Sequence, residues 1–185
     1  MRRIAFLLAA ALMASLLVVP SASAGKGGLK TLGTDPELDG PPALDITNLQ
    51  VGRAGKNLEI RIGVANMFPV VSGYPALPGI EWTFSVGSRT FIAEGVADVG
   101  GPAFYLFEER NGSFTQLESP TGTYDSADGF IKMLVPLKTI GARSGSHVIG
   151  TTLDGVPGDV DAHIHAGPQT YYADSMETTK HYSVP

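Results

Sequence analysis

The sequence predicts an all-β protein, an antiparallel β-sandwich that forms a single domain. Three observations predict this fold class. Apolar and polar residues alternate along most of the chain, which is typical of half-buried strands. The alternating segments are short and are separated by turn-forming residues, including many of the 23 glycines and 13 prolines. No segment after residue 24 repeats its apolar residues with the period of a long helix.

The first 24 residues predict a secretory signal peptide. Arg2 and Arg3 precede an almost purely apolar run over residues 4–19, and Ala22-Ser23-Ala24 has the small-x-small form of a cleavage site. The run is short for a transmembrane helix and no comparable run follows, so we expect a secreted, extracellular protein without a transmembrane segment in its mature chain. Residues 25–34 are rich in glycine and lysine and predict a flexible lead-in, and residues 35–185 predict the domain.

Within the domain, residues 44–51 and 57–65 alternate clearly and are joined by "GRAGK", which predicts a hairpin. Residues 79–86, "GIEWTFSV", repeat the alternation and place Trp82 on the side of the strand that faces the core. Residues 136–142 predict one helical turn, with proline at its start and glycine near its end, and the proline-rich residues 67–78 predict a loop. Further strands are expected over "RTFIAEGVA", "AFYLFEE", "SFTQLE", "GFIKMLVP", "SHVIGTTL", "QTYYAD" and "KHYSV".

The charge and composition of the chain exclude several classes of function. The formal net charge is −5, no basic patch is present, and nucleic acid is therefore not an expected partner. The absence of cysteine excludes a cysteine nucleophile, thiolate zinc, a c-type haem attachment and disulfides. The chain also lacks the Gly-x-Ser-x-Gly context of a nucleophile elbow. These features favour a protein that is not an enzyme.

Three segments resemble a known superfamily: "TDPELDGPPALDITNLQVG" near the start, "MLVPLKTIG", and the closing "ADSMETTKHYSVP". Together they resemble the secreted DOMON-like β-sandwich domains, which include family 9 carbohydrate-binding modules and the C-terminal module of glucodextranase-type enzymes. The resemblance covers residues 35–185. It implies a jelly-roll-like sandwich that binds sugars or, in other branches, haem through Met and His ligands, and no spacing in this chain singles out such a pair.

The resemblance also implies a structural calcium ion near the acidic N-terminal segment. Calcium takes hard oxygen ligands, many of them from loops, whereas aspartates beside proline and glycine are also ordinary turn formers. The calcium candidates are Asp35, Asp39, Asp45 and Asp174, the last brought close by the terminal strands.

The function expected from the resemblance is non-catalytic binding of an extracellular or cell-wall carbohydrate. Family 9 modules hold sugar between two tryptophans, and this chain has only Trp82, which the strand pattern places toward the core. Exposed tyrosines could provide stacking surfaces instead. The ligand-binding candidates are therefore Tyr74, Trp82, Tyr171 and Tyr172.

One further stretch, "GDVDAHIHAGP", offers an alternative function. Acids and histidines alternate in it with apolar residues, so it predicts either the solvated face of a strand or a site for zinc or another divalent metal, in a metal-binding protein or a metal-dependent enzyme. The Cα atoms of neighbouring residues on the same face of a strand lie about 6.6–7 Å apart. The four side chains therefore cannot all bind one ion unless the strand bends. The metal candidates are Asp159, Asp161, His163 and His165. A structural or interaction protein without a small ligand is the remaining alternative.

Overall fold

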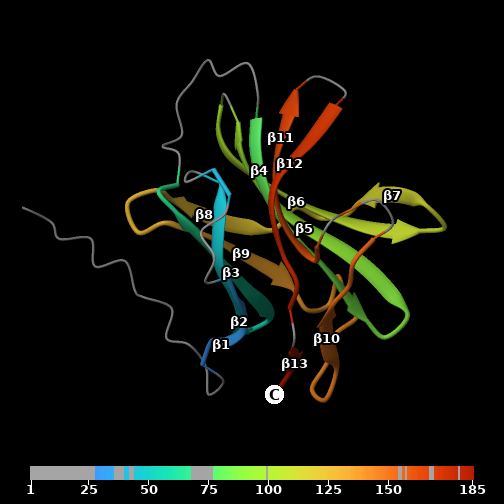
Figure 1. The fold of residues 1–185 in the computed structure, drawn as a ribbon. Helices are drawn as coiled ribbons and strands as arrows, with labels where there is room; N and C mark the ends of the chain where they lie inside the picture. Colours follow the sequence, from blue (N-terminus) through green and yellow to red (C-terminus); the bar gives the residue numbers. More distant parts are fainter. Residues whose placement is uncertain are drawn as a thin grey trace, which may run out of the picture.

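The structure, a computed structural model, confirms the predicted fold class. It describes residues 28–35, 40–41, 44–67, 77–98, 100–153, 156, 158–166, 169–178 and 180–185. These residues form strands joined by turns and loops, and the strands make two antiparallel sheets packed against each other (Figure 1). The described residues contain no helix, and thus none that could cross a membrane.

The first sheet has the order β1-β2-β3-β9-β8. Its centre is the predicted hairpin, in which Ala54 pairs with Asn57 around a two-residue turn. Gly55 has a φ of 61° in this turn, a conformation that glycine adopts without strain. The strands are β1 (Lys30–Thr34), β2 (Asp45–Ala54), β3 (Asn57–Ala65), β8 (Thr121–Asp125) and β9 (Phe130–Pro136).

The second sheet has the order β12-β11-β4-β5-β6-β7, with β10 paired to both β4 and β13. Strands β11 and β12, close to the C-terminus, therefore lie beside β4 from the first half of the chain (Figure 1). The strands are β4 (Leu77–Val86), β5 (Arg89–Asp98), β6 (Gly101–Arg110), β7 (Ser113–Gln116), β10 (His147–Gly150), β11 (Val160–Ala166), β12 (Gln169–Met176) and β13 (His181–Ser183).

The core fills the space between the sheets. As predicted, alternate residues of β4 point inward, and Trp82 and Phe84 are fully buried. The ring of Phe84 stacks on Trp82 at 4.6 Å and on Phe91 at 5.6 Å between centroids, arrangements that add to the gain from burying the rings. Side chains of the first sheet complete the core, among them Leu49, Ile60, Ile62, Ile131 and Met133.

Two predictions about local structure are wrong. The flexible lead-in, residues 25–34, is a strand in its second half, because Lys30–Thr34 pairs with β2 and the side chain of Leu32 is fully buried. This edge strand is held by the burial of Leu32 and by its backbone hydrogen bonds to β2. Its five residues are too few to show a clear alternation of apolar and polar side chains, so the sequence does not indicate the strand. The helical turn of residues 136–142 is a series of hydrogen-bonded turns, in which Thr139 N donates to Pro136 O and Ala142 N to Leu137 O.

Two ion pairs to the buried carboxylate of Glu108 stabilise one end of the second sheet. Glu108 of β6 accepts hydrogen bonds from Arg89 Nε at 2.6 Å and from Arg110 Nη2 at 2.9 Å. The hydrogen bond from Arg89 and then that from Arg110 lower the pKa of Glu108 to about 2, although burial acts in the opposite direction.

We therefore expect Glu108→Gln to lower the free energy of unfolding at neutral pH. A folded-state pKa of about 2, against an ordinary 4.5, gives stability that is present above pH 4.5 and is lost as the pH falls toward 2. The difference between the variant and the wild type should shrink across this window in urea unfolding followed by circular dichroism. The exposed Glu118→Gln is the control, and a Glu108→Gln effect that stays constant with pH would contradict the assignment.

Candidate functional site

The outer face of the second sheet, opposite the core, carries a row of acids. In the pairing of β5, β4 and β11, Glu94 lies directly opposite Glu81, and Glu81 lies directly opposite Asp161. Paired residues of neighbouring strands point to the same face, so the alternation that buries Trp82 also turns Glu81 outward, toward the other two acids. Like charges in directly opposite positions destabilise a sheet, so this row of acids lowers the free energy of unfolding when its members are ionised.

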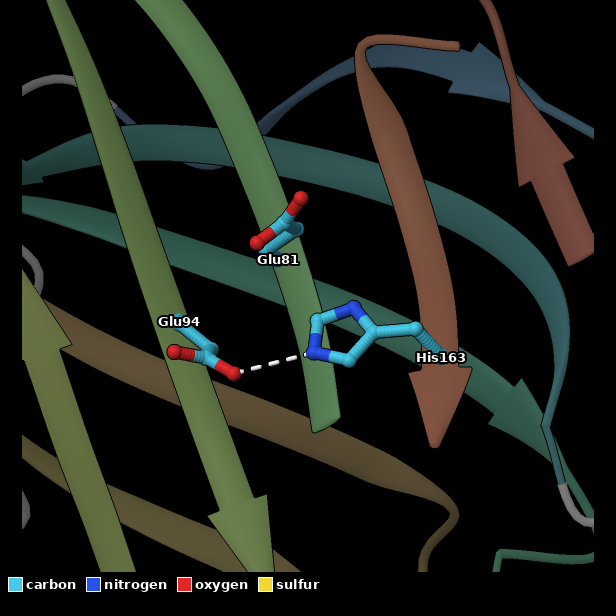
Figure 2. A group of neighbouring side chains, drawn as sticks. All are labelled: Glu81, Glu94 and His163. Carbon is cyan, nitrogen blue, oxygen red and sulfur yellow. Dashed lines mark hydrogen bonds and ion pairs between the residues drawn. The ribbon is translucent and has the colours of Figure 1, made fainter. Parts of the chain in front are cut away.

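His163 of β11 joins this row by reaching across β4. Its Nε2 lies 3.0 Å from Glu94 Oε1, and Figure 2 shows the imidazole extending over β4 toward Glu94, with Glu81 alongside. The residue beneath the imidazole is Gly79, which pairs with His163. A Cβ atom at Gly79 would lie 2.4 Å from His163 Nε2 and 2.8 Å from Glu94 Oε1, so only glycine leaves room for this contact.

A β-bulge brings a tyrosine to the same face. The register of β11 and β12 shifts between Ala162 and His163, so that Ala162 pairs with Asp174 but His163 pairs with Tyr172. Tyr172 therefore points to the outer face beside His163, with the two rings edge to face at 6.1 Å between centroids. Asp174 instead points to the inner side. Bulges of this kind commonly redirect side chains at functional sites.

A pocket of about 360 Å³ lies over this cluster. Glu81, Glu94 and His163 supply its carboxyl and imidazole groups, Thr170 and Tyr172 add hydroxyl groups, and the rest of its lining is aromatic or aliphatic. The apolar walls come from the neighbouring strands β5, β6, β7 and β12 and from the segment that precedes β11. The lining residues are Glu81, Ile92, Glu94, Phe107, Phe114, Leu153, Val156, His163, Thr170 and Tyr172.

The surroundings of the cluster shift Glu81 and the neighbouring Asp161 toward their protonated forms. Burial, then the charges of Glu94 and Asp161, raise the pKa of Glu81 to about 8. Burial is also the largest cause for Asp161, whose pKa rises to about 7 although a hydrogen bond from Gly158 N opposes the rise. A pocket-lining carboxyl group with a pKa raised this far, as in Glu81, is typical of functional sites.

The stretch that contains His163 is not a solvated strand face. Asp159, Asp161 and His163 are at most 3% exposed, while Val160 and Ala162 point into the core as predicted. The solvated-face prediction is wrong because His163 lies among the residues that line a pocket, and Thr178, which follows β12, is hydrogen-bonded to Asp159.

Of the four metal candidates of this stretch, the three whose side chains the structure describes, Asp159, Asp161 and His163, do not converge on one point. Asp159 accepts hydrogen bonds from Thr178 N, at 2.7 Å, and from Thr178 Oγ1, and so anchors the segment after β12. Asp161 Oδ1 accepts a hydrogen bond from Gly158 N at 3.2 Å. His163 instead lies with two glutamates from other strands, and one ligand atom from each of Glu81, Glu94 and His163 lies within 4.8 Å of the others. The side chain of His165 lies outside the described residues.

The calcium candidates meet only in part. Asp174 does reach the N-terminal segment, as expected, because its Oδ2 accepts a hydrogen bond from Ile46 N at 2.6 Å, next to the buried Asp45. Asp35 N donates to Thr47 O at the start of the same region, and Asp39 lies outside the described residues. In the part of the chain that the structure describes, no group of three acidic ligands forms there. Calcium binding stays a prediction.

The sugar-binding candidates also separate. Trp82 is fully buried in the core, as its place in the strand predicted, so it cannot stack on a ligand. Tyr171 is exposed outside the pocket and its hydroxyl donates to Gln169 Oε1, whereas Tyr172 lines the pocket. Tyr74 lies outside the described residues.

Sequence reasoning missed both glutamates of the cluster and the phenylalanines of the pocket wall. The signal that was present is a glutamate at an outward position of a strongly apolar strand, as in "GIEWTFSV" and "FIAEGVA".

Two packed antiparallel sheets and a pocket on the outer face of one of them define a β-sandwich protein with a candidate small-ligand site. Comparisons with models of known protein families, with curated proteins and with solved structures find no match.

Proposed function

We propose that the protein is a secreted, non-catalytic binding module whose carbohydrate ligand enters the pocket on the second sheet. The observation that carries this proposal is the composition of the pocket, with apolar walls around a floor of two carboxyl groups and an imidazole. Sugars present apolar C–H faces, which stack on aromatic rings, and hydroxyl groups, which need hydrogen-bond partners. A concave, mostly apolar site with a few convergent polar groups is the usual form of a small-ligand pocket.

The aromatic residues at the pocket support stacking. Phe114 and Tyr172 line the pocket and remain 56% and 39% exposed, although burial of such large rings would stabilise the fold. Phe107 adds a third ring from β6. A pocket of this volume suits a short saccharide or the end of a longer chain.

The polar floor supports recognition of hydroxyl groups. With its pKa raised to about 8, Glu81 keeps its proton at neutral pH and can donate a hydrogen bond, while its carbonyl oxygen accepts one. Donors and acceptors placed side by side are what a sugar hydroxyl needs, because it both donates and accepts.

Removal of the pocket aromatics tests the proposal. We expect Tyr172→Ala and Phe114→Ala each to weaken saccharide binding by roughly 5- to 30-fold, because a stacked ring contributes about 1–2 kcal/mol. A glycan array would identify the ligand, and isothermal titration calorimetry would measure the variants. Tyr171→Ala is the matched control, since Tyr171 is a neighbouring exposed tyrosine outside the pocket. Failure of the wild type to bind any glycan, or equal losses in Tyr171→Ala and Tyr172→Ala, would contradict the proposal.

A further inference from the structure

The floor of the pocket has a second property that sugar binding does not require. We propose that Glu81, Glu94 and His163 bind a divalent transition-metal ion, with zinc as the ion that these donors fit best. The site draws one ligand from each of three adjacent strands, β4, β5 and β11.

The donor atoms are already close enough for one ion. All three lie within 4.8 Å of one another, and His163 Nε2 and Glu94 Oε1 are 3.0 Å apart. Ligands about 2.0–2.2 Å from a tetrahedral zinc ion lie roughly 3.4 Å from each other, so small rotations of the glutamate side chains complete the geometry. Figure 2 shows the three side chains gathered over β4, with the glutamates coming from β4 and β5 and the histidine from β11.

The row of acids in this region points to a cation independently of the distances between the three ligand atoms. Glu81, Glu94 and Asp161 stand side by side in the sheet. Asp161 is fully buried, and its Oδ2 accepts no hydrogen bond from the residues that the structure describes. No lysine or arginine is among the residues that line the pocket. A buried carboxylate oxygen without a partner is costly, and a divalent ion two residues along the strand would offset that cost electrostatically.

The site is also held rigidly. Its ligands lie on central strands and not on loops, and Gly79 keeps open the path of the imidazole across β4. Any side chain at position 79 would close the site, since even a Cβ atom would meet His163 Nε2 at 2.4 Å.

The donor set selects the type of ion. An imidazole with two carboxylates suits zinc or a similar transition metal, whereas calcium and magnesium take oxygen ligands. Three protein ligands leave one tetrahedral position, which here opens to the pocket, so that water or a ligand oxygen can occupy it.

Zinc binding to the full mature chain tests the proposal. After dialysis against a chelator, titration with zinc chloride in the calorimeter should show one equivalent bound per chain. Cobalt chloride should give the visible absorption of a tetrahedral ion. Loss of a direct ligand in Glu94→Gln or His163→Ala should weaken zinc binding by more than the roughly 10–100-fold that outer-sphere changes cause. Glu94→Gln preserves the shape of the side chain, so it remains informative if His163→Ala does not fold, which circular dichroism would show.

The matched control is His181→Ala. The exposed rings of His147 on β10 and His181 on β13 lie edge to face with their centroids 5.0 Å apart, and this pair is a competing place where added zinc could bind. Zinc binding lost in His181→Ala but kept in Glu94→Gln would overturn the proposal. The absence of stoichiometric zinc or cobalt binding, or binding of calcium in their place, would overturn it as well. In either case His163 and Glu94 would form only a hydrogen-bonded pair.

Discussion

Replacement of Trp82 by alanine is expected to lower the free energy of unfolding by about 3–5 kcal/mol, because it leaves a large cavity in a fully packed core. Trp82 is 0% exposed and stacks on Phe84, which in turn stacks on Phe91. Trp82→Ala therefore removes the buried indole ring itself and also the packing that it gives to Phe84 and, through Phe84, to Phe91. Urea unfolding at a fixed pH, followed by circular dichroism, measures the change.

Trp82→Phe should cost much less, about 1.5 kcal/mol or below, because a ring remains in place. The indole Nε1 of Trp82 has no hydrogen-bond partner among the described residues, so phenylalanine also removes a buried polar group that stabilises nothing. Saccharide binding by Trp82→Phe should equal that of the wild type. Equal losses of stability in the two variants, or a loss of binding in Trp82→Phe at unchanged stability, would contradict a purely structural role for this tryptophan.

The strands could be predicted from the sequence because each strand carries its own pattern. Apolar and polar residues alternate so regularly over residues 57–65 and 79–86 that the sequence predicts the burial of Leu58, Ile60 and Trp82. Strand β1 has a single buried anchor, Leu32, and pairing along its backbone does the rest. Backbone pairing leaves no pattern in the sequence, so the composition of residues 25–34 predicts a flexible segment where the structure has a strand.

The site could be predicted only in part, because its residues come from strands that are distant in the chain. His163 was named from its place in an alternating stretch, but its partners Glu81 and Glu94 lie 82 and 69 residues away in the sequence. Only the strand order β11-β4-β5 makes them neighbours. Tyr172 reaches the site through a β-bulge, and a shift of one position in register cannot be read from alternation.

Replacement of Glu81 is the second substitution from which we expect a large change in the free energy of unfolding, measured in the protein without metal. We expect Glu81→Gln to be more stable than the wild type in the presence of a chelator, by roughly 1–3 kcal/mol at pH 8.5. The full shift of the Glu81 pKa would give more, but Glu81 keeps some contact with solvent, which weakens the effect. The charged and titratable groups that face Glu81 are Glu94 on β5, Asp161 and His163 on β11, and Tyr172 on β12.

The pH dependence follows from the direction of the shift. The pKa of Glu81 is about 8 in the folded protein against an ordinary 4.5, so between these values the folded state holds a proton that the unfolded state has released. The contribution of Glu81 to the stability of the wild type therefore falls as the pH rises from 4.5 to 8. Glu81→Gln has no such proton, so this contribution to the pH dependence is absent from the variant. The advantage of the variant should be small near pH 4.5 and largest above pH 8.

Glu59→Gln is the control for this measurement. Glu59 is also a mid-strand glutamate, but its cross-strand partners are Gly52 and Leu134, so no acid stands opposite it and its replacement should change stability little. Addition of zinc should reverse the order of wild type and Glu81→Gln, because a ligand that binds only the folded state stabilises the protein that retains the complete site. A wild type that stays the more stable of the two in chelator at pH 8.5 would show that the row of acids has no cost. Stability measured against pH in chelator gives the destabilisation that comes from placing Glu81 beside Glu94 and Asp161. Stability measured with added zinc gives the separate stabilisation by the metal ion.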